Sequence, residues 1–242
     1  MRLRLAGVLG LLVLWQGAAS LLGPRGALIL PPPGEVVLRL AELFRDRSFW
    51  LDGGRTLLEV GGSLALILGL GLALGVALGA SSRLDRFCEP ALSLLQATPV
   101  VSWLALAVFA FGIGWRGPVL LTTLNLLPLA ALTVRSGFRS VDGELLEMAR
   151  VFRVPPVRVL TRIVLPSLRP FLRAALDVAA PGAWKAVLVT EYLCGDAGWG
   201  VRLSWARQTV DTPSLYAVTL AAVLGGWGFE RLLRLPRRDR PC

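Results

Sequence analysis

Long stretches without a charged side chain constrain the fold of this sequence more than any other feature. Five of them occupy residues 5–24, 61–82, 91–115, 117–134 and 212–229. Each has about the 17 to 25 residues that a helix needs to cross ~30 Å of hydrocarbon. A sixth stretch, 174–193, is interrupted by Asp177, Lys185 and Glu191. Because hydrocarbon offers backbone groups no hydrogen-bond partner, we predict an all-α, polytopic membrane protein with about six transmembrane helices.

The composition agrees with this class and excludes several kinds of chemistry. Hydrophobic residues make up 55% of the chain and charged residues 17%, against about 25% charged in soluble domains. There is no histidine, which excludes Ser–His–Asp and Cys–His catalysis. The three cysteines lie far apart, and the single lysine, Lys185, lies between Trp184 and Ala186, not in a phosphate-binding loop. We therefore expect no catalytic residue, no metal site and no ATP hydrolysis by this chain.

The positive charges predict an orientation. The net charge is +10, and with the N-terminus inside and six spans, most arginines fall in cytoplasmic segments, as the positive-inside rule requires. The predicted loop 135–173 alone carries eight of them. We expect both termini to be cytoplasmic and attribute the high isoelectric point to topology, not to nucleic-acid binding.

The chain divides into three predicted segments. Residues 1–24 form a first transmembrane helix, although Arg2, Arg4 and the small residues at 17–19 would also fit a signal peptide. Residues 25–55 form an outer-surface segment in which 34–47 reads as an amphipathic helix. Residues 56–242 form a core of five spans. We expect Trp199 and three other tryptophans near the outer ends of the spans to be interfacial anchors.

Small residues recur every four positions in the second predicted span, at Gly71, Gly75 and Gly79. This spacing lets helix backbones approach closely in lipid. Packing within the chain is the favoured interpretation, and a seam between two chains is the alternative.

The loop 135–173 carries an apolar set among its arginines. A loop that needed only solvation would not keep such a set, so we interpret it as a docking surface for a cytoplasmic partner. Pro155 and Pro156 end one helix and start another. A purely structural cap remains the alternative.

Three ionisable residues in the interrupted sixth stretch are candidates for the translocation pathway. Asp177 and Lys185 are eight residues apart, about 80° around the helix axis, so they share a broad face. We hypothesise that this face lines the pathway and that Lys185 meets an anionic solute. A buried ion pair, or a lysine that reaches to the interface, is the alternative. Glu191 could be a gate contact or an acceptor for neighbouring backbone amides.

The loop resembles the EAA loop of ABC importer permeases. Glu147-Met148-Ala149-Arg150-Val151-Phe152-Arg153, followed by Ile163-Val164-Leu165-Pro166, matches the spacing of that motif. One alanine of the motif is Met148, and its glycine is Arg153. Similarity to the nitrate, sulfonate, taurine and bicarbonate branch extends over nearly the whole chain. It lies in Leu30-Pro31-Pro32-Pro33-Gly34-Glu35-Val36, Thr56-Leu57, Ala97-Thr98-Pro99-Val100, Phe111-Gly112-Ile113-Gly114, Val189-Thr190-Glu191 and Gly198-Trp199-Gly200.

The resemblance implies a type I ABC importer permease in the bacterial inner membrane. A homodimer of this chain would translocate a small anionic or N/S-containing solute by alternating access. Two cytoplasmic ATPases would bind the loops and carry ATP and Mg²⁺, with no cofactor on this chain, and an external solute-binding protein would deliver the solute. An ion-coupled secondary transporter is the alternative, for which Asp177 and Glu191 are the available intramembrane acids.

The resemblance also assigns the residues of ATPase coupling. In that family the short helix after the loop's glycine, here roughly 155–162, couples ATPase closure to the spans. Glu147 would support the loop, and Arg150, Arg153 and Arg158 would face the ATPase. Because glycine suits a turn with positive φ, Arg153 is either strained or the turn differs. The implied coupling residues are Glu147, Ala149, Arg150, Arg153, Pro155, Pro156, Arg158, Ile163 and Pro166.

Overall fold

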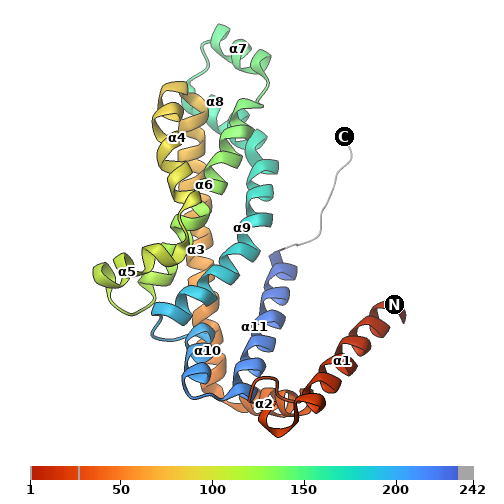
Figure 1. Cartoon of the computed structure of the whole chain (residues 1–242). Coiled ribbons are helices and arrows are strands. Elements are labelled where there is room, and N and C mark those ends of the chain that lie inside the picture. The colour runs from red at the N-terminus through yellow and green to blue at the C-terminus, as the bar shows by residue number, and fades with distance from the viewer. Residues whose placement is uncertain (1, 27, 234–242) are drawn as a thin grey trace. The chain divides into compact units, whose positions relative to one another are not determined.

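The computed structural model describes residues 2–26 and 28–233, and in this part of the chain every regular element is a helix (Figure 1). The all-α prediction is confirmed, while the arginines beyond residue 233 lie outside the described residues. The chain forms two compact units, Met1–Leu57 with Glu191–Cys242 (unit 1) and Leu58–Thr190 (unit 2). The helices are α1 (Arg2–Gly26), α2 (Pro33–Arg45), α3 (Arg47–Ala80), α4 (Ser82–Ala97), α5 (Val100–Phe111), α6 (Arg116–Arg139), α7 (Gly143–Val151), α8 (Pro156–Val159), the π-helical turn η1 (Leu160–Val164), α9 (Leu165–Cys194), α10 (Trp199–Gln208) and α11 (Thr212–Leu233).

Fewer helices qualify as membrane spans than the sequence predicted. Among the described residues, α3 and α6 are long and apolar enough to cross a membrane, and the pair α4 and α5 makes a third if it is counted as one span. That pair is bent by 98°, so the prediction of one continuous span at 91–115 is wrong. The break has a local cause, because Pro99 cannot extend α4 and holds Thr98 in an extended conformation (φ −83°, ψ 123°). The remaining predicted spans are helical, as α1, α9 and α11.

The predicted amphipathic helix is present as α2. It begins with Pro33, whose fixed φ suits the first helical position. Val36 and Leu43 are buried, whereas Val37 and Leu38 are exposed. Within unit 1, α2 packs against α11.

The glycine series of α3 lies directly against α6 in unit 2. Gly71 meets Ala130, Gly75 meets Val134 and Gly79 meets Phe138. Residue numbers rise together along both helices, so α3 and α6 run parallel. A methyl group on Gly75 would lie 2.6 Å from the carbonyl oxygen of Ala131. Packing within the chain, the favoured interpretation of this spacing, is confirmed.

Helix α9 packs on α6 in the opposite direction, since Gly137 meets Phe171 and Gly182 meets Leu126. Where these helices meet, Val134, Val164 and Leu168 form a buried cluster. The side chains packed around it come from α3, α6, α7, α8 and α9: Leu72, Val76, Phe138, Leu146, Val159 and Leu172.

We predict opposite effects of adding one methyl group at two glycines of α3. Gly75→Ala would force a methyl group into the backbone of α6 and lower the free energy of unfolding by about 1 to 3 kcal/mol. Gly69→Ala, with no neighbouring atom within 4 Å, would leave the stability unchanged or raise it by up to about 1 kcal/mol. Thermal unfolding in detergent measures both variants. Equal effects would contradict the close contact of α3 and α6.

Candidate functional site

Of the predicted loop 135–173, residues 135–139 end α6 and residues 165–173 begin α9, so the part between these helices is 140–164. We call this part the coupling loop, after its predicted role, and it forms the tip of unit 2 (Figure 1). Asp142 starts α7 by accepting a hydrogen bond from the backbone N–H of Glu144 (2.9 Å). Pro155 and Pro156 then open α8, which continues through η1 into α9. The predicted sequence of helix, sharp turn and short helix is confirmed. The predicted short helix at 155–162 is in fact α8 followed by part of a π-helical turn.

Arg153 occupies the left-handed position that ends α7. Its φ is +49°, the N–H of Val154 donates to the carbonyl of Ala149 (2.8 Å), and the N–H of Arg153 donates to that of Arg150 (3.0 Å). These two bonds define a Schellman motif, whose left-handed residue is usually glycine. The turn is therefore the one a glycine would make, and Arg153 adopts it at a cost of about 1 to 2 kcal/mol.

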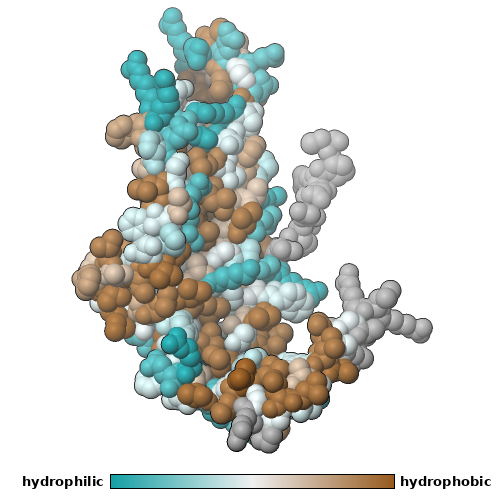
Figure 2. All heavy atoms as spheres, viewed as in Figure 1, coloured by the Kyte–Doolittle hydropathy of each residue, from teal (hydrophilic) through white to brown (hydrophobic). Residues whose placement is uncertain are grey.

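The coupling loop has an inner and an outer face. On the inner face, Ala149 is buried, and Leu146 and Val159 pack against the cluster of Val134, Val164 and Leu168. On the outer face, the exposed fractions are 73% for Val151, 75% for Phe152 and 70% for Val157. The same end of unit 2 carries many hydrophilic side chains (Figure 2). An apolar surface surrounded by charges is typical of a docking site, so the outer face agrees with the predicted docking surface.

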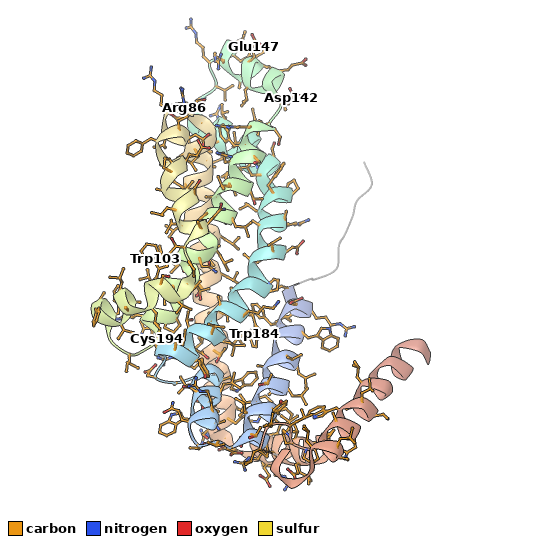
Figure 3. All side chains as sticks on the ribbon, viewed as in Figure 1. Arg86, Trp103, Asp142, Glu147, Trp184 and Cys194 are labelled. Carbon is orange, nitrogen blue, oxygen red and sulfur yellow. The ribbon has the colours of Figure 1, made fainter. Side chains whose placement is uncertain are left out.

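Most of the other predicted coupling residues are exposed, on the coupling loop or, for Pro166, at the start of α9. Glu147, on α7 (Figure 3), is exposed, and its side chain forms no hydrogen bond or ion pair within the described residues, so its supporting role stays a prediction. Arg150, Arg158, Pro155, Pro156 and Pro166 are exposed, and Ile163 is half-buried.

An ion-pair cluster that sequence reasoning missed joins α4 to α6 beside the loop. The two carboxylate oxygens of Asp85 accept one hydrogen bond each from Arg135 and Arg139, both of 2.6 Å. The Asp85 side chain is 11% exposed. Two arginines four residues apart on one helix were the available signal, but their partner lies 50 residues away in the sequence.

The predicted pathway residues differ in their surroundings. Asp177 and Lys185 on α9 are exposed, and neither has an ion-pair partner among residues 2–26 and 28–233. The structure thus does not bring them into a buried ion pair within one chain. Glu191, near the end of the same helix, is 1% exposed.

Glu191 organises the turn between α9 and α10 in unit 1. Its Oε2 accepts hydrogen bonds from the hydroxyl of Thr56 (3.0 Å) and the N–H of Gly200 (2.8 Å). The Thr56 hydroxyl oxygen in turn accepts from the N–H of Trp199 (2.9 Å). A carboxylate at the first turn of α10 also suits the helix dipole. Glu191 was predicted to be either a gate contact or an acceptor for neighbouring backbone amides, and the structure shows it as an acceptor for the backbone amide of Gly200.

Aromatic and charged side chains extend this turn. Trp199 stacks on Phe49 with ring centroids 5.1 Å apart and donates from Nε1 to the carbonyl of Phe49 (3.0 Å). The guanidinium carbon of Arg202 lies 5.5 Å from the ring centroid of Phe49. Arg202 also forms ion pairs with Asp46 and Asp52. Because Trp199 is 7% exposed, its prediction as an interfacial anchor is wrong: its indole is a core side chain of unit 1.

A cavity of about 430 Å³ adjoins this turn within unit 1. Its charged lining is paired, since Arg39 donates to Ser214 (2.7 Å) and contacts Asp211 (3.5 Å), and Arg202 pairs with Asp52. Nearby, hydrogen bonds from the Ser48 side chain and backbone hold the pKa of Asp46 below its ordinary value. These pairs join α2, α3, α10 and α11 at the rim of the cavity.

Comparison with known proteins gives one family. The model of "Binding-protein-dependent transport system inner membrane component" matches residues 65–234. Among curated proteins, the riboflavin transport system permease protein RibX of Chloroflexus aurantiacus is 33% identical over 216 residues, 88% of this chain and 80% of its own length. The putative aliphatic sulfonates transport permease protein SsuC of Bacillus subtilis is 26% identical, over 92% of this chain and 82% of its own length. The taurine transport system permease protein TauC of Escherichia coli is 25% identical, over 96% of this chain and 86% of its own length.

Solved structures share the fold at low identity. A bacterial alginate ABC transporter in complex with a pentasaccharide-bound periplasmic protein superposes with a TM-score of 0.70 at 14% identity, over 97% of this chain and 93% of that one. The inward-facing MetNI methionine ABC transporter gives a TM-score of 0.56 at 20% identity, over 78% and 94%.

We predict that the turn around Glu191 requires glycine at position 198. Gly198 has a φ of +115°, and a methyl group there would lie 2.4 Å from the Glu191 carboxylate. Gly198→Ala should therefore lower the free energy of unfolding by about 3 kcal/mol or more, through both backbone strain and overlap. Gly112→Ala is the matched control, because Gly112 also has a positive φ (+72°) but no atom within 4 Å. Equal losses in the two variants, measured by thermal unfolding in detergent, would show that contact with Glu191 adds nothing.

Proposed function

The chain belongs to the family of binding-protein-dependent transport system inner membrane components, and from this premise we propose that two copies of it form the membrane path of an ATP-driven importer for a small anionic solute. It is the transmembrane permease subunit of an ABC importer, in the class that includes sulfonate, taurine and bicarbonate permeases. Such a permease moves its solute and leaves ATP hydrolysis, with its Mg²⁺, to partner subunits. Family membership does not support the alternative of an ion-coupled secondary transporter.

The outer face of the coupling loop carries the proposal that ATPases dock there. Val151, Phe152 and Val157 are exposed at the tip of a segment whose inner face is fully engaged with the core of unit 2. An apolar side chain held rigidly in water favours association with a complementary pocket, because its ordering is already complete. With the loop in the cytoplasm, as the arginine distribution predicts, the pocket belongs to a cytoplasmic ATPase.

The packing of the loop supports a route from ATPase to membrane helices. Leu146 and Val159 contact a cluster to which α6 and α9 both contribute, and Asp85 ties α4 to α6 at the same end. Displacement of the loop when the ATPases close would therefore move these helices together. Packed helices move as rigid bodies between discrete arrangements, as alternating access requires.

The anionic character of the solute rests on Lys185. A twofold axis along the membrane normal places identical residues of two copies at equal depth, so two exposed Lys185 side chains would share one level of the membrane. An unpaired ammonium group inside a membrane is costly unless it faces water or an anion. The relatives' own names include sulfonates and taurine but also riboflavin, so this residue carries the argument.

We expect the chain to retain ATPase subunits when it is expressed with its neighbouring open reading frames and purified in mild detergent. The readout is the mass and stoichiometry of the complex, with two copies of this chain and two Walker-motif subunits expected. Phe152→Ala should lower the amount of ATPase retained about tenfold or more, as loss of a central apolar contact does. Phe87→Ala is the control, because Phe87 on α4 is equally exposed (82%) but lies outside the loop. A wild-type chain that retains no Walker-motif subunit would contradict the proposed function.

We expect Lys185→Met to weaken uptake of an anion and Lys185→Arg to preserve it. Loss of the charge should raise the half-saturating concentration about tenfold or more, because the guanidinium but not the thioether can pair with an anion. Uptake of radiolabelled taurine, methanesulfonate and bicarbonate into vesicles that contain the assembled transporter measures this. Arg173→Gln is the control for loss of a positive charge on the same helix, because Arg173 is also exposed on α9 but is not among the candidate pathway residues. Unchanged half-saturation in both lysine variants, for the anion that the wild type imports, would exclude this role.

A further inference from the structure

Arg153 adopts a left-handed backbone conformation, which disfavours any residue other than glycine. The left-handed residue of a Schellman motif is freest as glycine, which has no Cβ to crowd the following carbonyl. Arg153 nevertheless makes the same two backbone hydrogen bonds at φ +49°. No polar contact of the Arg153 side chain compensates for this strain, because within the described residues the side chain forms no hydrogen bond or ion pair.

Arg153 belongs to a run of positive charge without neutralisation. From residue 148 to residue 162 the loop contains no acidic residue. Its four arginines are all exposed, and none has an ion-pair partner in the described part of the chain: Arg150, Arg153, Arg158 and Arg162. Asp85, by contrast, shows that arginines near this end of unit 2 do pair where a carboxylate is available.

We propose that Arg153 selects the ATPase partner by pairing with a carboxylate on the rim of the groove that receives Phe152. This inference rests on the proposed function, and it adds the chemistry of the partner, an apolar pocket with an acidic rim, and the residue that recognises it. A guanidinium group matches a carboxylate with two parallel hydrogen bonds, and charge complementarity at an interface serves specificity and register.

The neighbours of Arg153 favour a protein partner over lipid headgroups. Phe152, Val151 and Val157 lie among these arginines in the sequence and are 70% exposed or more. A headgroup layer needs the charges alone, whereas an apolar centre with a charged rim is the pattern of a protein interface. Phe152 and Arg153 are also neighbours in the sequence and are both exposed, so one groove and its rim can contact both.

The first test exploits the scarcity of lysine. Lys185 is the single lysine of the chain, so Arg153→Lys introduces a unique amine at the loop tip while keeping its charge. Carbodiimide treatment of the complex with the copurified ATPase subunit should couple this lysine to an aspartate or glutamate of that subunit, identified by mass spectrometry. Arg169→Lys is the control, because Arg169 is equally exposed and unpaired but lies on α9, outside the coupling loop. Cross-links confined to Glu144 or Glu147 of this chain, or equal cross-linking from the control, would overturn the proposal.

The second test separates binding from folding. Arg153→Gly should raise the thermal midpoint of the isolated permease by a few degrees, because the turn relaxes, yet weaken ATPase binding about tenfold and reduce its salt dependence. Arg153→Gln should weaken binding similarly, and Arg169→Gln should not. Variants that bind the ATPase as tightly as the wild type would overturn the proposal while leaving the proposed function standing. A defect seen only in vesicles with anionic lipid, and absent in neutral detergent, would also overturn it, since the arginine would then bind headgroups. A wild-type chain that holds no ATPase contradicts the proposed function itself.

Discussion

The close contact between α3 and α6 is the constraint on which unit 2 depends. Lipid offers apolar side chains no gain from leaving it, so helices in a membrane are held by dispersion contacts between surfaces that fit. Gly71, Gly75 and Gly79 present no side chain along one stripe of α3, and Ala130, Val134 and Phe138 of α6, with the carbonyl oxygen of Ala131, occupy that space. Helix α9 then packs on α6 through Gly137 in the same manner. Helix α6 thereby becomes the element that its neighbours share.

This arrangement is consistent with the proposed coupling between the loop and the helices. The coupling loop contributes Leu146 and Val159 to the cluster that α6 and α9 form, so it has no independent freedom at its base. Its tip, by contrast, offers Phe152 and Arg153 to solvent. The loop is therefore packed at its base and exposed at its tip, and the strained backbone of Arg153 lies at the exposed end.

Unit 1 is organised by a buried carboxylate instead of small residues. Glu191 is enclosed by Gly198 and accepts hydrogen bonds from Thr56 and Gly200. A carboxylate buried in this way is stabilising only while its donors stay in place, which makes the turn into α10 sensitive to single-atom changes. Trp199, whose backbone N–H donates to the Thr56 hydroxyl, also stacks on Phe49. The hydrogen bonds of Glu191 thus keep the turn between α9 and α10 in one conformation.

The sequence by itself determined the helical class, the start of two helices at prolines and the shared face of the glycine series. These properties follow from local chemistry: hydrocarbon forbids unpaired backbone groups, Pro33 and Pro156 open helices, and spacing by four places glycines on one face. The presence of a proline did not by itself predict the break at Pro99, because Pro128 and Pro181 lie inside helices that continue. Only the tertiary structure decided which side chains meet. Thr56 and Glu191 are 135 residues apart, and Asp85 and Arg135 are 50 apart. No periodicity records such pairs, since their contact depends on how distant helices cross, and for the same reason the burial of Trp199 could not be read from its position in the chain.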